Sequence, residues 1–100
     1  MKTKKNAERR IEIKKMLTEN GYYISPLGLV QKSISDEYVL ADIPNSYSRV
    51  YDGKWIVLST GIAQSEFQEQ FERERKGLIS FLNQEKIGHR NVGEQHYHKD

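Results

Sequence analysis

Residues 47–59 have the sequence YSRVYDGKWIVLS, and this stretch decides the fold class. Two β-prone runs, Tyr47–Tyr51 and Lys54–Ser59, flank the dipeptide Asp52-Gly53. An Asp-Gly pair accepts the positive φ angles of a two-residue type I′ turn. The stretch therefore predicts an antiparallel hairpin.

Two more β-prone segments precede this hairpin. Leu29–Ile34 and Glu37–Ile43 alternate with a period of two and are separated by Ser35-Asp36. Turn-forming residues at 44–46 (Pro-Asn-Ser) then lead into the hairpin. Together these segments predict a meander of three or four antiparallel strands.

A helix is expected on the N-terminal side of the strands. Ile13, Met16 and Leu17 fall on one face at the helical period. Asn6 is suited to cap its start, and Gly21 to end it in a left-handed conformation. Residues 1–5 carry no aliphatic side chain except at Met1, and we expect them to form a frayed basic arm.

A longer helix is expected after the strands. Ser65 and Gln68 match a capping box, and the pattern continues to about Lys86. Gly77 in its middle indicates a kink or a close contact. Residues 88–100 contain little apolar surface and are expected to form a loose, flexible tail. The apolar residues that share one face of this helix are Phe67, Phe71, Leu78 and Leu82.

The order of elements predicts an α+β fold, a two-layer sandwich in a single domain over residues 1–87. Strict alternation decides which sheet face the helices cover. It assigns to the covered face Val39, Ala41, Ile43, Val50, Trp55 and Val57. The open face then carries Leu40, Ile56 and Leu58 as well as tyrosines.

Composition excludes several classes of protein. There is no cysteine among the 100 residues, so disulfides, thiolate metal sites and cysteine nucleophiles are excluded. We expect a cytoplasmic protein. The longest apolar run, Trp55–Leu58, is far shorter than a membrane span, so no membrane partner is expected. The glycines form no phosphate-binding loop motif, and no cofactor is predicted.

Catalysis and metal binding are also not predicted. His89, His96 and His98 all lie in the last twelve residues, where a base held rigidly beside a nucleophile is not expected. The pair at 96 and 98 resembles a chelate but lacks partners for a structural metal site. Asp42 followed by Asp52-Gly53-Lys54 has the letters of a metal-dependent nuclease pattern, but the turn accounts for Asp52 better.

The charge is distributed unevenly. The first fifteen residues hold seven basic and two acidic side chains, 7 − 2 = +5, and the other 85 hold nine and twelve, 9 − 12 = −3. Such asymmetry favours an anionic partner. We therefore predict a small non-catalytic accessory protein that binds nucleic acid, or a complex containing it. The predicted contact residues are Lys2, Lys4, Lys5, Arg9, Arg10, Lys14 and Lys15.

A second surface offers an alternative. Aromatic and cationic side chains on the open sheet face suit a protein interface, single-stranded nucleic acid or simple cross-strand packing. The alternative function is a protein inhibitor or adaptor, by analogy with small proteins of phages and mobile elements. It would dock on a larger enzyme through the long helix or through this face, whose residues are Tyr38, Tyr47, Arg49, Tyr51 and Lys54.

Overall fold

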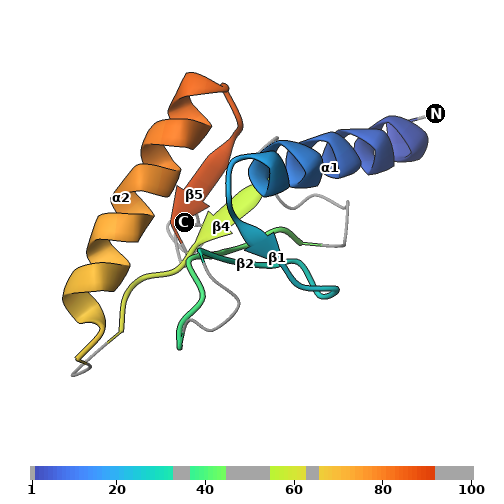
Figure 1. The fold of residues 1–100 in the computed structure, drawn as a ribbon. Coiled ribbons are helices and arrows are strands. Elements are labelled where there is room, and N and C mark those ends of the chain that lie inside the picture. Colours follow the sequence, from blue (N-terminus) through green and yellow to red (C-terminus); the bar gives the residue numbers. More distant parts are fainter. Residues whose placement is uncertain (1, 33–36, 45–54, 63–65, 92–100) are drawn as a thin grey trace, which may run out of the picture.

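The computed structural model describes residues 2–32, 37–44, 55–62 and 66–91, with only the backbone for residues 2–7. Helix α1 and helix α2 frame five short strands (Figure 1). The elements in chain order are α1 (Lys2–Glu19), β1 (Tyr23–Ile24), β2 (Leu29–Gln31), β3 (Ala41–Asp42), β4 (Ile56–Leu58), α2 (Gln68–Gln84) and β5 (His89–Asn91).

The strands form one mixed sheet in the order β1-β2-β3-β4-β5. The first four pair antiparallel, but not in the predicted arrangement. Strand β1 was not predicted, and β4 lies between β3 and β5, so residues 56–58 do not pair with Tyr47–Tyr51 as the predicted hairpin requires. Strand β5 pairs with β4 in parallel, Ile56 lying opposite His89 and Leu58 opposite Asn91. The α+β class is confirmed, whereas the strand count and the purely antiparallel pairing are corrected. The Asp52-Gly53 turn lies outside the described residues.

Strand β5 also corrects the start of the expected tail. The backbone N–H groups of Trp55 and Ile56 both donate to the carbonyl of Gly88, at 2.8 and 3.2 Å. Ile87 is buried, 2% exposed, and this anchors the chain as it turns back from α2 toward β4. Residues 88–91 are therefore part of the fold, and residues 92–100 lie outside the described part.

Arg75 of α2 fixes the far end of the parallel strand pair. Its Nε–H donates to the carbonyl oxygen of Ser59, which follows β4, at 2.6 Å. Its Nη2 also donates to Oδ1 of Asn91, the last residue of β5. One guanidinium thus joins α2, β4 and β5 through charge-assisted hydrogen bonds.

The sheet face assigned by strict alternation is wrong for β4. Ile56 and Leu58 are buried, at 0 and 2% exposed, whereas Trp55 and Val57 are half-buried. Val50 lies outside the described residues. The hairpin register that set this assignment therefore does not govern the direction of the β4 side chains.

Around β3 the predicted sheet face is only partly correct, because Ala41 and Ile43 are buried as predicted but Leu40 is buried as well. A local irregularity of the strand explains this. Val30 is paired with Ala41, yet the N–H of Leu40 also donates to the Val30 carbonyl at 2.8 Å. Two residues opposite one constitute a β-bulge, which breaks the two-residue alternation. Leu40 and Ala41 are consequently both fully buried.

Both helices pack into a single apolar core. Ile13 and Leu17 of α1 are fully buried, as are Leu78 and Leu82 of α2, which confirms the predicted helix faces. Phe71 is 1% exposed and Phe67 packs against the same cluster. Burying each such side chain contributes about 1.5–3 kcal/mol.

The ends of α1 confirm one prediction and correct another. Gly21 has φ 91°, and the N–H of Tyr22 reaches back to the carbonyl of Leu17 at 3.0 Å. This is the predicted left-handed end. The helix starts at Lys2, however, and not at Asn6, so residues 2–5 belong to α1 and are not a separate arm.

The ends of α2 differ from their sequence signals. The helix begins after Phe67, and Oε1 of Gln68 accepts the N–H of Ile62 at 2.7 Å. Ser65, the other member of the predicted capping box, lies outside the described residues. At its other end Lys86, with φ 58°, occupies the left-handed position that glycine usually fills. The bond from Ile87 N–H to the Leu82 carbonyl at 2.8 Å holds this conformation.

Candidate functional site

Among the described side chains, those that anchor the basic helix α1 in the core lie toward one end. Its buried anchors, Ile13 and Leu17, lie in its C-terminal half. Its N-terminal end extends beyond the strands (Figure 1). At 1.5 Å per residue, the stretch from Lys2 to Ile13 spans roughly 16 Å. This extension carries most of the predicted nucleic-acid contacts.

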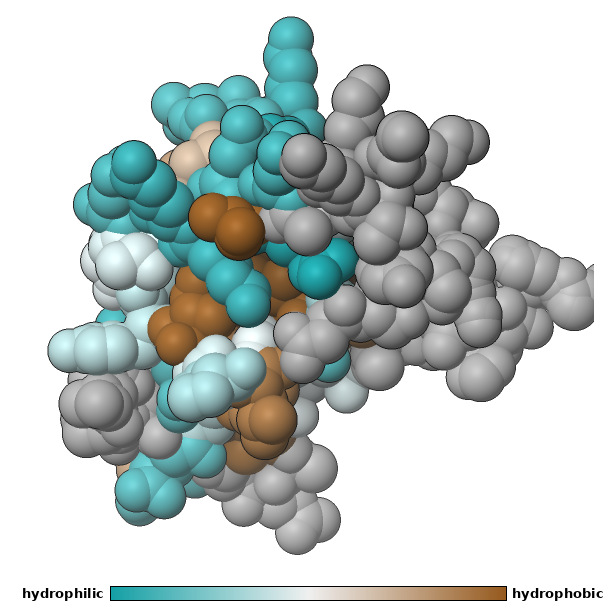
Figure 2. Space-filling view, turned by 90° about the vertical axis from the view of Figure 1, so that its right-hand side faces the viewer, coloured by the Kyte–Doolittle hydropathy of each residue, from teal (hydrophilic) through white to brown (hydrophobic). Residues whose placement is uncertain are grey.

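The structure places the predicted cations of α1 in different surroundings. Lys2, Lys4 and Lys5 lie in the first turns of the helix. Nη1 of Arg9 lies 3.0 Å from Oε1 of Glu12, in an ion pair with substantial exposure of both side chains. Lys15 is exposed, and Lys14 is half-buried. Figure 2 looks onto the side toward which α1 points, and the upper part of this view is mainly hydrophilic, with apolar surface below it.

Arg10 differs from its neighbours on α1. The residue is half-buried, and its Nη1 atom is shielded from solvent without a hydrogen-bond partner. A buried guanidinium N–H without an acceptor is unfavourable, since it has lost water and gained nothing in exchange. Helical spacing in the sequence already places Arg10 at the flank of the apolar stripe, but it does not indicate that one of its donors is buried without an acceptor.

Tyr38 does not lie on an open surface, contrary to the predicted partner-binding face. It is 6% exposed, and its ring meets that of Phe71 edge-on with centroids 5.5 Å apart. Its hydroxyl donates to Oε1 of Glu74 on α2 at 2.6 Å. The bulge at Leu40 and Ala41 accounts for this change, because it shifts the alternation of the residues before it.

The remainder of that predicted face is not described. The four residues concerned are Tyr47, Arg49, Tyr51 and Lys54, which all lie outside the described residues. Among the residues with described side chains, the exposed large apolar ones are instead Ile11, Tyr23 and Leu27, at 65, 49 and 71% exposed. The first of these was visible in the sequence as an apolar residue off the core-facing stripe of its helix.

Asp42 is the one described member of the nuclease-like pattern. It lies in β3 opposite Val57 of β4 and is half-buried. Burial raises the pKa of its carboxyl group above the ordinary value. Asp52 and Lys54 lie outside the described residues, and across the described part of the chain no three acidic, histidine or cysteine side chains are grouped to hold a metal ion.

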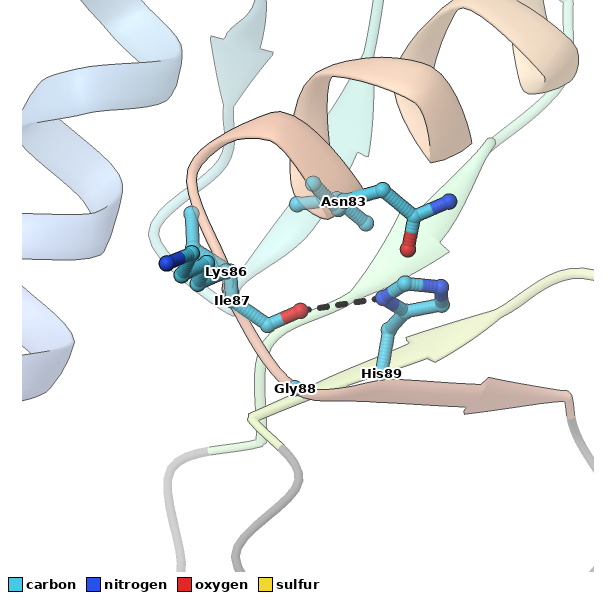
Figure 3. A pocket seen from close by; sticks show the side chains of 6 residues that line it. Asn83, Lys86, Ile87, Gly88 and His89 are labelled. Atoms are coloured by element: carbon cyan, nitrogen blue, oxygen red, sulfur yellow. Dashed lines mark hydrogen bonds between the residues drawn. The ribbon is translucent and has the colours of Figure 1, made fainter.

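A shallow hollow of about 370 Å³ lies where α2 ends and β5 begins (Figure 3). Nδ1 of His89 lies 3.0 Å from the carbonyl oxygen of Ile87, which can only accept, so Nδ1 is the donor in this hydrogen bond. Among the described residues that line the hollow there is no carboxylate. Its lining residues are Leu82, Asn83, Lys86, Ile87, Gly88 and His89.

Comparison with known proteins gives no relative. No protein-family model matches the chain, and no curated protein or solved structure has significant similarity to it. Neither α1 nor α2, as far as the structure describes them, is long and apolar enough to cross a membrane.

Proposed function

We propose that this chain is a small, non-catalytic, cytoplasmic accessory protein that binds nucleic acid through the basic helix α1. The observation that carries the proposal is the position of the charge. Seven of the 16 basic residues lie within the first fifteen residues, against two of the 14 acidic ones. They occupy a helix whose N-terminal end extends beyond the strands (Figure 1).

The direction of α1 strengthens this argument. The N-terminal end of a helix carries about half a positive charge from its aligned peptide dipoles, and acidic residues in the first turn usually offset it. The first turn of α1 has no acidic residue. Lysines there add to the dipole, at a cost to the isolated helix. A phosphate backbone would neutralise the lysine charges and the positive end of the helix dipole, and the released counterions would favour binding.

The protein-docking alternative has less support. Tyr38, its only described tyrosine, is committed to the core and to Glu74. The long helix α2 buries its apolar face, Phe71, Leu78 and Leu82, against the sheet. An inhibitor or adaptor would therefore have to dock through the polar side of α2 or through residues that the structure does not describe.

Fluorescence anisotropy with a labelled 20-base-pair DNA duplex at several salt concentrations tests the proposal. If four or five phosphates are contacted, the slope of log affinity against log salt should be about −4. The double substitution Lys4→Ala/Lys5→Ala should flatten it by about 1.8, since each contact contributes about 0.9. Because phosphate contacts carry no sequence information, duplexes of different sequence should behave alike.

The matched control is Arg73→Ala/Lys76→Ala, which removes the same charge from exposed positions of α2. We expect its slope to equal that of the native protein. Absence of binding at about 50 mM salt, or equal flattening by the two double variants, would reject α1 as a nucleic-acid-binding element.

A further inference from the structure

The charges of α1 are segregated around the helix axis. Of the residues with described side chains, the acidic ones Glu8, Glu12 and Glu19 are all exposed. Three of the four cations, Arg9, Arg10 and Lys14, are instead half-buried, and only Lys15 is exposed. The outward side therefore carries 1 − 3 = −2, and the flank toward the sheet carries +3.

Helical spacing explains this segregation. Arg10 precedes the buried residues Ile13 and Leu17 by three and seven positions, so all three lie on one side of the helix. The side of α1 that carries Ile13 and Leu17 over the sheet therefore carries Arg10 where the helix extends beyond the strands. A polyanion would be attracted to this flank and repelled by the outward, acidic side.

The two arginines on this flank differ in how they are held. Arg9 is engaged by Glu12 at 3.0 Å and would have to leave it to contact a phosphate. The Nη1 atom of Arg10 is buried and has no hydrogen-bond acceptor. Turning toward a phosphate would supply that missing acceptor, and a guanidinium suits phosphate oxygens through two parallel N–H donors.

We infer that nucleic acid lies against the sheet-side flank of α1, with Arg10 as the principal phosphate contact and Glu12 restraining Arg9. This inference rests on the proposed function and adds to it the face that is used. A structural role for Arg10 is the competing explanation, because the aliphatic part of an arginine side chain also covers apolar core surface.

Anisotropy titrations of single variants against the same DNA duplex separate these possibilities. Arg10→Met keeps an apolar stem but removes the charge, and should weaken binding about 3- to 10-fold and flatten the salt slope by about 0.9. Lys15→Met, on the outward side of the same helix, removes an equal charge and should weaken binding clearly less than Arg10→Met. Lys76→Met, at an exposed position of α2, is the control and should change affinity less than twofold. Glu12→Gln should strengthen binding, since it releases Arg9.

Arg10→Lys distinguishes charge from packing, and thermal unfolding is followed for every variant. The inference requires this variant to keep the native salt slope even if its affinity falls. It is overturned if native protein binds but Arg10→Met and Lys15→Met lose affinity equally. It is also overturned if the loss of affinity in Arg10→Lys is fully accounted for by the fraction of this variant that thermal unfolding shows to be unfolded. If native protein itself does not bind at low salt, the proposed function fails.

Discussion

The hydroxyl of Tyr38 donates a hydrogen bond of 2.6 Å to Oε1 of Glu74, and this contact joins the segment before β3 to the middle of α2. Gln70, one turn earlier in α2, donates to the other carboxylate oxygen of Glu74 at 3.1 Å. A tyrosine expected at an open surface is therefore a structural link between the two layers. The hydrogen bond satisfies a polar group that would otherwise be buried at a cost.

Replacing Tyr38 by phenylalanine tests this link. Tyr38→Phe keeps the edge-on contact of the ring with Phe71 but removes the donor to a carboxylate, so the free energy of unfolding should fall by about 1–2 kcal/mol. Tyr23→Phe is the control at an exposed tyrosine, and a change within about 0.5 kcal/mol is expected there. Urea unfolding measures both; an equal effect of the two substitutions would contradict the assignment of Tyr38 to the core.

Two glycines should respond oppositely to alanine. A Cβ at Gly77 of α2 would meet nothing within 4 Å, so Gly77→Ala should stabilise the protein by up to about 1 kcal/mol. At Gly28, with φ 95°, a Cβ would lie 2.3 Å from the carbonyl oxygen of Ile43. Gly28→Ala should therefore destabilise it. Thermal unfolding of both variants checks the signs, and stabilisation by Gly28→Ala would contradict the left-handed conformation of Gly28 between β1 and β2.

Asp42 should make stability depend on pH. Burial raises the pKa of its carboxyl group in the folded protein, so the folded state binds a proton more readily than the unfolded state. Stability should fall as pH rises through the interval between the two pKa values. Asp42→Asn should accordingly be more stable than the native protein at neutral pH, with a gap that closes in acid. Chemical denaturation at several pH values measures the gap; one that widens in acid would contradict this account.

Local signals in the sequence predicted the helices well. The stripe of Ile13 and Leu17 and the left-handed Gly21 depend on residues within a few turns of one another. The same information located Phe71, Leu78 and Leu82 on one face of α2. Such patterns follow from helix geometry alone, without knowledge of distant partners.

Features set by tertiary pairing were not predictable in this way. The bulge at Leu40 and Ala41 has no glycine or other local marker, and it reverses the alternation before β3. Strand β5 consists of His89, Arg90 and Asn91, which show no apolar alternation and are ordered by pairing with β4. The buried Ile87, just before it, was the available signal that the chain returns to the core.

Titration of isotope-labelled protein with a short DNA duplex, followed through backbone amide chemical shifts in NMR spectra, tests the central claim most directly. It locates bound nucleic acid on the protein independently of any substitution. We predict shifts that saturate with added duplex, are largest over residues 2–15 of α1 with Arg10 among them, and disappear at high salt. Shifts concentrated instead on α2 or β5, or spectra unchanged by the duplex at low salt, would contradict nucleic-acid binding through α1.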